Sequence, residues 1–261
     1  MHIFEIIIPG TWLVSDDRDW AWEIEEILRC LEEQFYEANF ALNMFLHAIS
    51  HDKEDMSIAN WEADSDRWFA IQRELESQLG SPYERQNRDD IHLQTEILFK
   101  REKWQSGRLP SEFKKKKAFI YARAFLYALD SFEKFLNVLK QQPQVPQTVS
   151  ELHVKFSSIF PQLRGVRNSA QHMEDRSRGL GAGKNPKPLE LKPIENGTFS
   201  APDGAIILDY LNGTKYGNTM ADGHYGEVDV SPSSMKSLTS IFQSLLDSFE
   251  WKGPKRHLPS I

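Results

Sequence analysis

The amino-acid sequence predicts a mainly α-helical bundle with a small antiparallel β excursion before its last helix. Apolar residues recur every three or four positions through the first two thirds of the chain, which is the spacing of helices that bury one face. Short runs rich in β-branched residues follow, separated by Asn-Gly pairs, before the helical spacing returns near the C-terminal end. We expect one domain over residues 1–261, with residues 178–230 as a loop and β-hairpin excursion.

The composition is that of an ordinary globular protein. Of 261 residues, 40% are hydrophobic, and a chain of this length buries enough surface to fold without metal or disulfide cross-links. The single cysteine, Cys30, has no partner for an internal disulfide, which favours a reducing compartment. No secretion signal is visible, and no apolar stretch approaches the roughly 20 residues that a membrane-spanning helix needs. We therefore expect a cytoplasmic protein without a membrane partner.

Four helices are expected before residue 141. The first runs from Asp17 to about Ser50, with acidic residues in its first turn, where the helix dipole favours them. Two weaker patterns cover Asp64 to Leu79 and Asp89 to Trp104, and each ends at glycine and proline. Ser111 then caps the strongest helix, whose apolar stripe continues to Leu139 and predicts the central helix of a bundle.

The rest of the chain divides into two short helices, the β excursion and a last helix. A short helix follows Thr148, and a further helix covers about Gln162 to Ser177. Asn-Gly, a common two-residue hairpin turn, occurs at residues 196–197 and 212–213. The expected strands are Leu189–Ile194, Ala205–Leu211 and Tyr225–Val230. Ser231 and Pro232 then supply a cap and a first-turn proline for a helix that must pack on the bundle.

Charge is distributed unevenly along the chain. Residues 1–97 hold seven Lys and Arg against 22 Asp and Glu, whereas residues 98–187 hold 18 against seven. Residues 188–261 hold six against nine. The basic middle third favours a polyanion such as RNA as a partner, with mutual neutralisation of the acidic and basic parts as the alternative.

The segment Leu163–Arg176, LRGVRNSAQHMEDR, concentrates polar groups on one face of a helix. Its apolar side is expected to dock on the bundle. The opposite arc holds Arg164, Arg167, Asn168, Gln171, His172 and Asp175. A guanidinium matches phosphate oxygens and steadies a charged transition state, and an imidazole exchanges protons near neutral pH. With RNA the 2′-hydroxyl itself can be the nucleophile, so no metal or cofactor is required.

The run Arg167-Asn168-Ser169-Ala170-Gln171-His172 resembles the signature of the HEPN superfamily, in which an Arg, a polar residue, a short spacer and a His lie on a late helix of a helical bundle. The resemblance implies a HEPN-like bundle and, in active members, a metal-independent endoribonuclease that is usually a homodimer with one composite cleft. By that resemblance Arg167 and His172 are the catalytic pair and Asn168 supports them. It also implies a defence or toxin–antitoxin context, with an antitoxin or regulatory protein as a partner.

Further basic and polar residues are expected to hold the substrate. These are Arg164, Gln171, Arg176, Arg178 and Lys184, with Lys187 as a further phosphate contact. The segment RGLGAGK at Arg178–Lys184 does not match a Walker loop, because Arg178 stands where a glycine is needed and Asn185 replaces the Ser or Thr. It is expected to be a flexible basic loop.

Two alternatives stay open for the motif. One is a non-catalytic HEPN-type module that uses the same face to bind a nucleotide, a nucleic acid or a protein. The other is a structural role, in which Arg167 and His172 form salt bridges with Glu174, Asp175 or the acidic N-terminal helix. A metal site at His172, Glu174 and Asp175 is not expected, because the spacing matches no standard helical metal pair.

Two basic features outside the motif are expected to have ordinary roles. Trp104, among Lys100, Arg101 and Lys103, is expected in the core, with stacking on a base as the alternative. The four lysines at 114–117 are expected to form a solvated face, with a bound anion as the alternative because cations oppose the dipole at a helix start.

Overall fold

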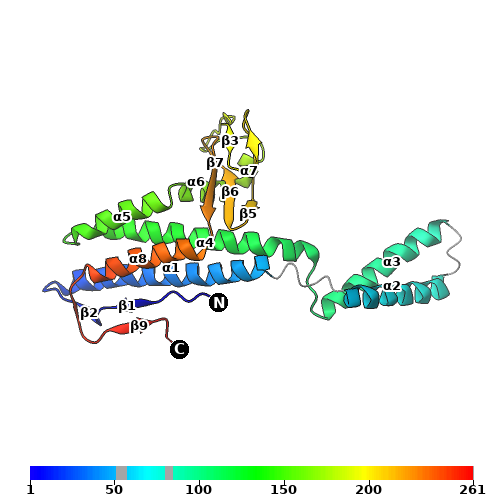
Figure 1. Cartoon of the computed structure of the whole chain (residues 1–261), viewed down its shortest axis with the longest axis horizontal. Coiled ribbons are helices and arrows are strands. Elements are labelled where there is room, and N and C mark those ends of the chain that lie inside the picture. The colour runs from blue at the N-terminus through cyan, green and yellow to red at the C-terminus, as the bar shows by residue number, and fades with distance from the viewer. Residues whose placement is uncertain (51–57, 80–84, 261) are drawn as a thin grey trace. The chain divides into compact units, whose positions relative to one another are not determined.

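The computed structural model describes residues 1–50, 58–79 and 85–260, which form eight helices and four small antiparallel sheets (Figure 1). By their contacts they divide into two compact units, one made of Met1–Phe45 and Phe119–Ile261 and the other of Leu46–Ala118. The single domain expected over residues 1–261 stays a prediction. Among the described helices, none combines the length and the apolar character needed to cross a membrane.

Four helices form the bundle of the first unit: α1 (Arg18–Ser50), α4 (Ser111–Lys140), α5 (Gln147–Ile159) and α8 (Pro232–Asp247). Aromatic rings join them in the core. Phe242 of α8 lies 5.6 Å from Phe35 of α1 and 5.6 Å from Phe132 of α4, measured between ring centroids. Phe132 also stacks on Phe156 of α5 at 5.9 Å. The predicted helical bundle is confirmed, whereas its HEPN-like character and the central position of α4 stay predictions.

The last helix begins as the sequence predicts. Ser231 is the N-cap of α8, its Oγ accepts a hydrogen bond from the backbone N–H of Ser234 at 3.3 Å, and Pro232 occupies the first turn. This arrangement satisfies one of the N–H groups that a helix start leaves without a partner.

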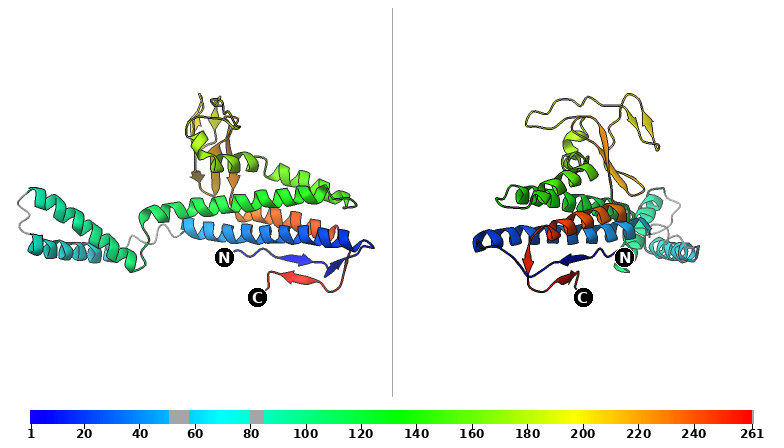
Figure 2. Two further views of the ribbon diagram at one scale, coloured as in Figure 1. Left: turned by 180° about the vertical axis from the view of Figure 1, so that it is seen from behind. Right: turned by 60° about the vertical axis from the view of Figure 1, so that its left-hand side comes forward.

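Two strand pairs that the sequence analysis did not predict join the chain ends. β1 (Ile6–Ile8) pairs with β9 (Arg256–Leu258), and β2 (Trp12–Leu13) pairs with β8 (Trp251–Lys252), all antiparallel. These two strand pairs, called the terminal ribbon below, lie on the side of the bundle opposite the β excursion (Figures 1 and 2). Gln243 of α8 holds the terminal ribbon by accepting from the Ile7 N–H at 2.8 Å and donating to the Ile7 carbonyl at 2.9 Å.

The β excursion contains a hairpin and a three-stranded sheet. β3 (Ile194–Glu195) pairs with β4 (Ser200–Ala201), and β6 (Lys215–Thr219) lies between β5 (Tyr210–Asn212) and β7 (Tyr225–Asp229). The Asn212-Gly213 turn is present, with Gly213 at φ +61°, and so is the turn at Asn196-Gly197. The expected strands are shorter than predicted, because only Ile194 of the first run and residues 210–211 of the second are paired in strands.

Strand β6 was missed because its sequence, KYGNT, is polar. The side chains of Asn218 and Thr219 are nevertheless buried, and they hydrogen-bond to the backbone of the segment before β5. Asn218 Oδ1 accepts from the Asp209 N–H at 2.7 Å, and Thr219 Oγ1 accepts from the Ile207 N–H at 2.9 Å. These bonds hold residues 205–209 beside β6 without a regular ladder.

The second unit contains the helices α2 (Ile58–Leu79) and α3 (Arg85–Gln105), which begin earlier than the predicted Asp64 and Asp89. Trp68 packs between them, with ring centroids 5.6 Å from His92 and 5.5 Å from Phe99. Trp104 does not join this packing and is 49% exposed, so the expected core position is wrong. Of the four lysines at 114–117, Lys115 and Lys116 are exposed and Lys114 and Lys117 are half-buried, so the expected solvated face is confirmed for two of them.

Candidate active site

The predicted helix from Gln162 to Ser177 is broken at His172. It divides into α6 (Leu163–Gln171) and α7 (Met173–Arg176), and His172 adopts φ −112° and ψ 45° between them. The His172 N–H closes the last turn of α6 on the Asn168 carbonyl at 3.0 Å, and its own carbonyl accepts from Arg176 N–H at 3.1 Å. The imidazole therefore lies at a helix end instead of along a helix face.

The face of α6 that was expected to dock on the bundle packs against the β excursion. Val166 is fully buried, and an added Cβ at Gly226 of β7 would lie 3.0 Å from its Cγ2. An added Cβ at Gly165 would lie 2.3 Å from Met220 Sδ. These two glycines let α6 and the β6–β7 hairpin approach closely.

Arg167 faces the bundle and not solvent, which corrects its expected place on an open polar arc. Its Nη2 donates to Asp130 Oδ2 of α4 at 2.5 Å, and its Nη1 donates to Gln171 Oε1 at 2.5 Å. The side chains of Arg167 and Asp130 are only 11% and 6% exposed. The Arg167 Nε is buried without a hydrogen-bond partner among the described residues.

The Asp130 carboxylate pairs with two cations, because Lys134 Nζ lies 2.7 Å from the same Oδ2 that accepts from Arg167. One carboxylate between a guanidinium and an ammonium leaves this cluster with one excess positive charge. The Lys134 side chain is 61% exposed, so the excess charge is open to solvent. Sequence reasoning missed Asp130, although a lone carboxylate between the buried Leu129 and Phe132 of α4 is a signal that a cation must meet it.

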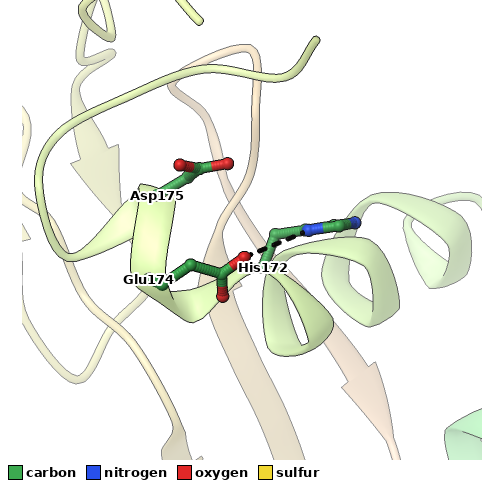
Figure 3. Close-up of side chains that lie close together, drawn as sticks. All are labelled: His172, Glu174 and Asp175. Carbon is green, nitrogen blue, oxygen red and sulfur yellow. Dashed lines mark hydrogen bonds and ion pairs between the residues drawn. The ribbon is translucent and has the colours of Figure 1, made fainter. Parts of the chain in front are cut away.

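His172 is 57% exposed, and its Nδ1 lies 3.4 Å from Glu174 Oε1 (Figure 3). Within the part of the chain that the structure describes, no hydrogen bond or ion pair joins His172 to Arg167, so the motif's two ends have separate partners. The structural alternative expected salt bridges from both residues, and its His172–Glu174 contact is present. For Arg167 the buried partner is Asp130, a residue that this alternative did not name.

The ligand atoms of His172, Glu174 and Asp175 lie within 4.8 Å of one another, so together they can hold a divalent cation. Arg178 competes for one of them, because its Nη2 donates to Asp175 Oδ1 at 2.7 Å. The expectation of no metal at this place stays a prediction.

The predicted substrate contacts and Asn168, the predicted supporting residue of the catalytic pair, differ in exposure. Arg164, Gln171, Arg178 and Lys184 are exposed, and Asn168 is half-buried. Arg176 is only 1% exposed, and its Nη1 donates to the carbonyls of Leu180 and Gly181, the second at 2.7 Å. Arg176 therefore anchors the glycine-rich loop and is not available to phosphate, which corrects its predicted role.

That loop is closed by backbone hydrogen bonds, from Gly181 N–H to the Lys187 carbonyl and from Leu189 N–H to the Gly179 carbonyl, each 2.7 Å. Gly179 and Gly183 have φ of +71° and +114°, which suits glycine. Lys184 and Lys187 are exposed cations of this loop.

Comparison of the chain with protein-family models, curated proteins and solved structures finds no match.

Proposed function

We propose that the exposed end of α6 is the active site of a metal-independent endoribonuclease, in which His172 is the general acid and base. The observation that carries the proposal is the position of the imidazole: it is exposed at a helix end with the Glu174 carboxylate 3.4 Å from Nδ1. A carboxylate on one ring nitrogen favours one tautomer and leaves Nε2 to exchange protons. Catalytic hydrogen bonds are often long before substrate binds, so a distance of 3.4 Å is compatible with this role.

The resemblance of Arg167-Asn168-x3-His172 to the HEPN signature supports the same function. By that resemblance the active form is a homodimer in which two motifs share one cleft. The resemblance also supports a role in a defence or toxin–antitoxin system, controlled by an antitoxin or regulatory protein. The lone Cys30 favours a cytoplasmic location for such a protein.

Charge around Arg167 suits a phosphate substrate. Arg167 and Lys134 share the single carboxylate of Asp130, so a phosphodiester meets an excess positive charge. Because the Arg167 guanidinium is held by Asp130 and Gln171, it needs little reorganisation when charge develops on the phosphoryl oxygens. Asp130 and Gln171 are positioning residues in this proposal.

The reaction follows from these roles. His172 accepts the proton of the 2′-hydroxyl, the 2′-oxygen bonds to the adjacent phosphorus, and the bond to the 5′-oxygen breaks. The leaving 5′-oxygen takes a proton from water or from the second His172 of the dimer. The products are a 2′,3′-cyclic phosphate and a 5′-hydroxyl, and every atom of the substrate is retained.

A non-catalytic binding module is the second candidate, and one observation favours it. The Arg167 guanidinium is already paired with a buried carboxylate and is only 11% exposed, which limits its access to a ligand. In such a module the exposed Arg164, Gln171 and His172 recognise the partner, and no bond is broken.

Incubation of the purified chain with labelled RNA in EDTA separates the two candidates. The ribonuclease proposal predicts cleavage of RNA to cyclic-phosphate ends and no cleavage of 2′-O-methyl RNA of the same sequence. Binding of both RNAs without cleavage of either would instead establish the binding module.

A further inference from the structure

A second basic surface lies in the Leu46–Ala118 unit, where α3 ends and α4 begins. A cavity of about 520 Å³ opens there, a size that accommodates a small ligand or one nucleotide of a strand. Its lining combines two aromatic side chains with four cations and one carboxylate: Phe99, Trp104, Lys100, Lys103, Arg108, Lys114 and Glu112. We call it the Trp104 pocket.

The local fold explains why these groups converge. The Arg108 N–H bonds to the Lys103 carbonyl at 3.0 Å and the Gly107 N–H to the Trp104 carbonyl at 3.0 Å, which is the Schellman pattern of a helix end. Gly107 has the required positive φ, +89°. The turn places Arg108 beside the last turn of α3, and Pro110 starts the next helix by accepting from the Lys114 N–H at 3.0 Å.

The pocket keeps a positive charge after its ion pairs are counted. Asp64 pairs with both Lys103, at 2.5 Å, and Arg108. Lys100 pairs with Glu96, and Glu112 also lines the pocket. Three carboxylates therefore face the four cations of the lining, which leaves one excess positive charge. Lys103 Nζ also lies 5.1 Å from the Phe99 ring centroid. Over residues 98–118 the chain has eight Lys and Arg against two Glu.

Trp104 is the second, independent feature. A tryptophan that is 49% exposed in a hollow and surrounded by cations offers an indole surface to a planar ligand. Bases stack on such rings whatever their sequence, while cations follow the phosphates. An anionic lipid surface would satisfy the cations but has no planar group to stack on the indole.

We propose that the Trp104 pocket binds single-stranded RNA, with one base stacked on Trp104 and the neighbouring phosphates held by the cations of the lining. The choice of RNA over DNA rests on the proposed function. The pocket itself is argued from its own residues and holds no part of the motif.

The test is binding of a labelled oligouridylate, which has no stable secondary structure, to the full chain carrying His172→Ala so that the probe is not cut. Trp104→Ala is expected to weaken binding roughly fivefold or more, and Trp104→Phe to restore most of it. Trp61→Ala is the matched control, because Trp61 is 70% exposed in the same unit and does not line the pocket.

Salt dependence tests the cations. Replacing Lys100 and Lys114 by Ala is expected to reduce the slope of log K against log salt by about 1.4, since each phosphate contact to a single strand contributes about 0.7. The exposed Lys155 and Lys236, replaced together, should leave the slope unchanged. Circular dichroism confirms that each variant is folded.

Equal effects of Trp104→Ala and Trp61→Ala, an unchanged salt slope, or Trp104-dependent binding only to anionic vesicles would each overturn the proposal. The outcomes also separate it from the ribonuclease. If RNA binding depends on Trp104 but the unmodified chain does not cleave RNA, the pocket is supported and the ribonuclease is refuted. If the unmodified chain cleaves RNA and binding does not depend on Trp104, the ribonuclease is supported and the pocket is refuted.

Discussion

Replacing Arg167 by Met should destabilise the protein as well as affect any activity. The replacement keeps the aliphatic stem but leaves Asp130, which is 6% exposed, without its guanidinium partner. Removal of one member of a buried ion pair costs about 3–5 kcal/mol. Lys134 still compensates Asp130 at 2.7 Å, so we expect the low end, about 3 kcal/mol, or roughly 6–12 °C in the melting temperature.

A double-mutant cycle isolates the pair. Asp130→Leu in the Arg167→Met background should recover most of the loss, because the buried charge is then gone. Urea unfolding measures the four free energies of unfolding. Arg164→Met is the matched control: it changes an exposed arginine of the same helix and should alter stability by less than about 0.5 kcal/mol. A loss below about 1 kcal/mol for Arg167→Met, or effects of the two substitutions that add, would refute the buried-pair account.

Three further predictions test other parts of the structure. Gly223→Ala should destabilise the β excursion by about 1–3 kcal/mol, because Gly223 has φ +84° and an added Cβ would lie 2.0 Å from the Glu190 carbonyl oxygen. Thermal unfolding measures the loss, and an unchanged melting temperature would contradict the prediction. Hydrogen bonds from Lys103 and Arg108 hold the pKa of Asp64 below its ordinary value of 3.8. The stability that the Asp64 carboxylate contributes is therefore present at neutral pH and lost as the pH falls through the lowered pKa. Asp64→Asn should reduce the fall of the melting temperature at acid pH, and an unchanged fall would exclude this contribution of Asp64. Added Zn²⁺ should leave RNA cleavage unchanged, because no metal site is expected at His172, Glu174 and Asp175 and Arg178 already pairs with Asp175. Inhibition by Zn²⁺ that Asp175→Asn relieves would contradict this and identify the three residues as a metal site.

Helices with a long apolar stripe or a clear cap were predictable from the sequence. The α4 stripe and the Ser231 cap of α8 depend on neighbours three or four residues apart, so local spacing contains the information. Strands β1 and β9 were missed for the opposite reason: Ile6 pairs with Leu258, and nothing local in either segment identifies a partner so distant in the chain.

The candidate site was predicted as a set of residues but not as a geometry. Helical spacing places Arg167 on an open arc with His172, and Arg176 is expected to contact phosphate. Both arginines are instead turned inward by acceptors elsewhere, Asp130 on α4 and the carbonyls of the glycine-rich loop. Which side of a short helix is buried depends on what packs against it. For α6 both sides are covered, by the β6–β7 hairpin and, through the Arg167–Asp130 pair, by α4.

The central claim is that His172 transfers protons during RNA cleavage, and single-turnover rates in EDTA at saturating protein test it most directly. His172→Gln should lower the rate by about 100-fold or more, the contribution typical of a general acid or base. His257→Gln is the control, because His257 is 60% exposed and lies 3.7 Å from the Glu5 carboxylate, as His172 lies near Glu174. His257 belongs to β9, on the side of the bundle opposite the β excursion. This substitution should leave the rate within about twofold. Equal rates for the two variants, or no cleavage by the unmodified chain, would contradict the account.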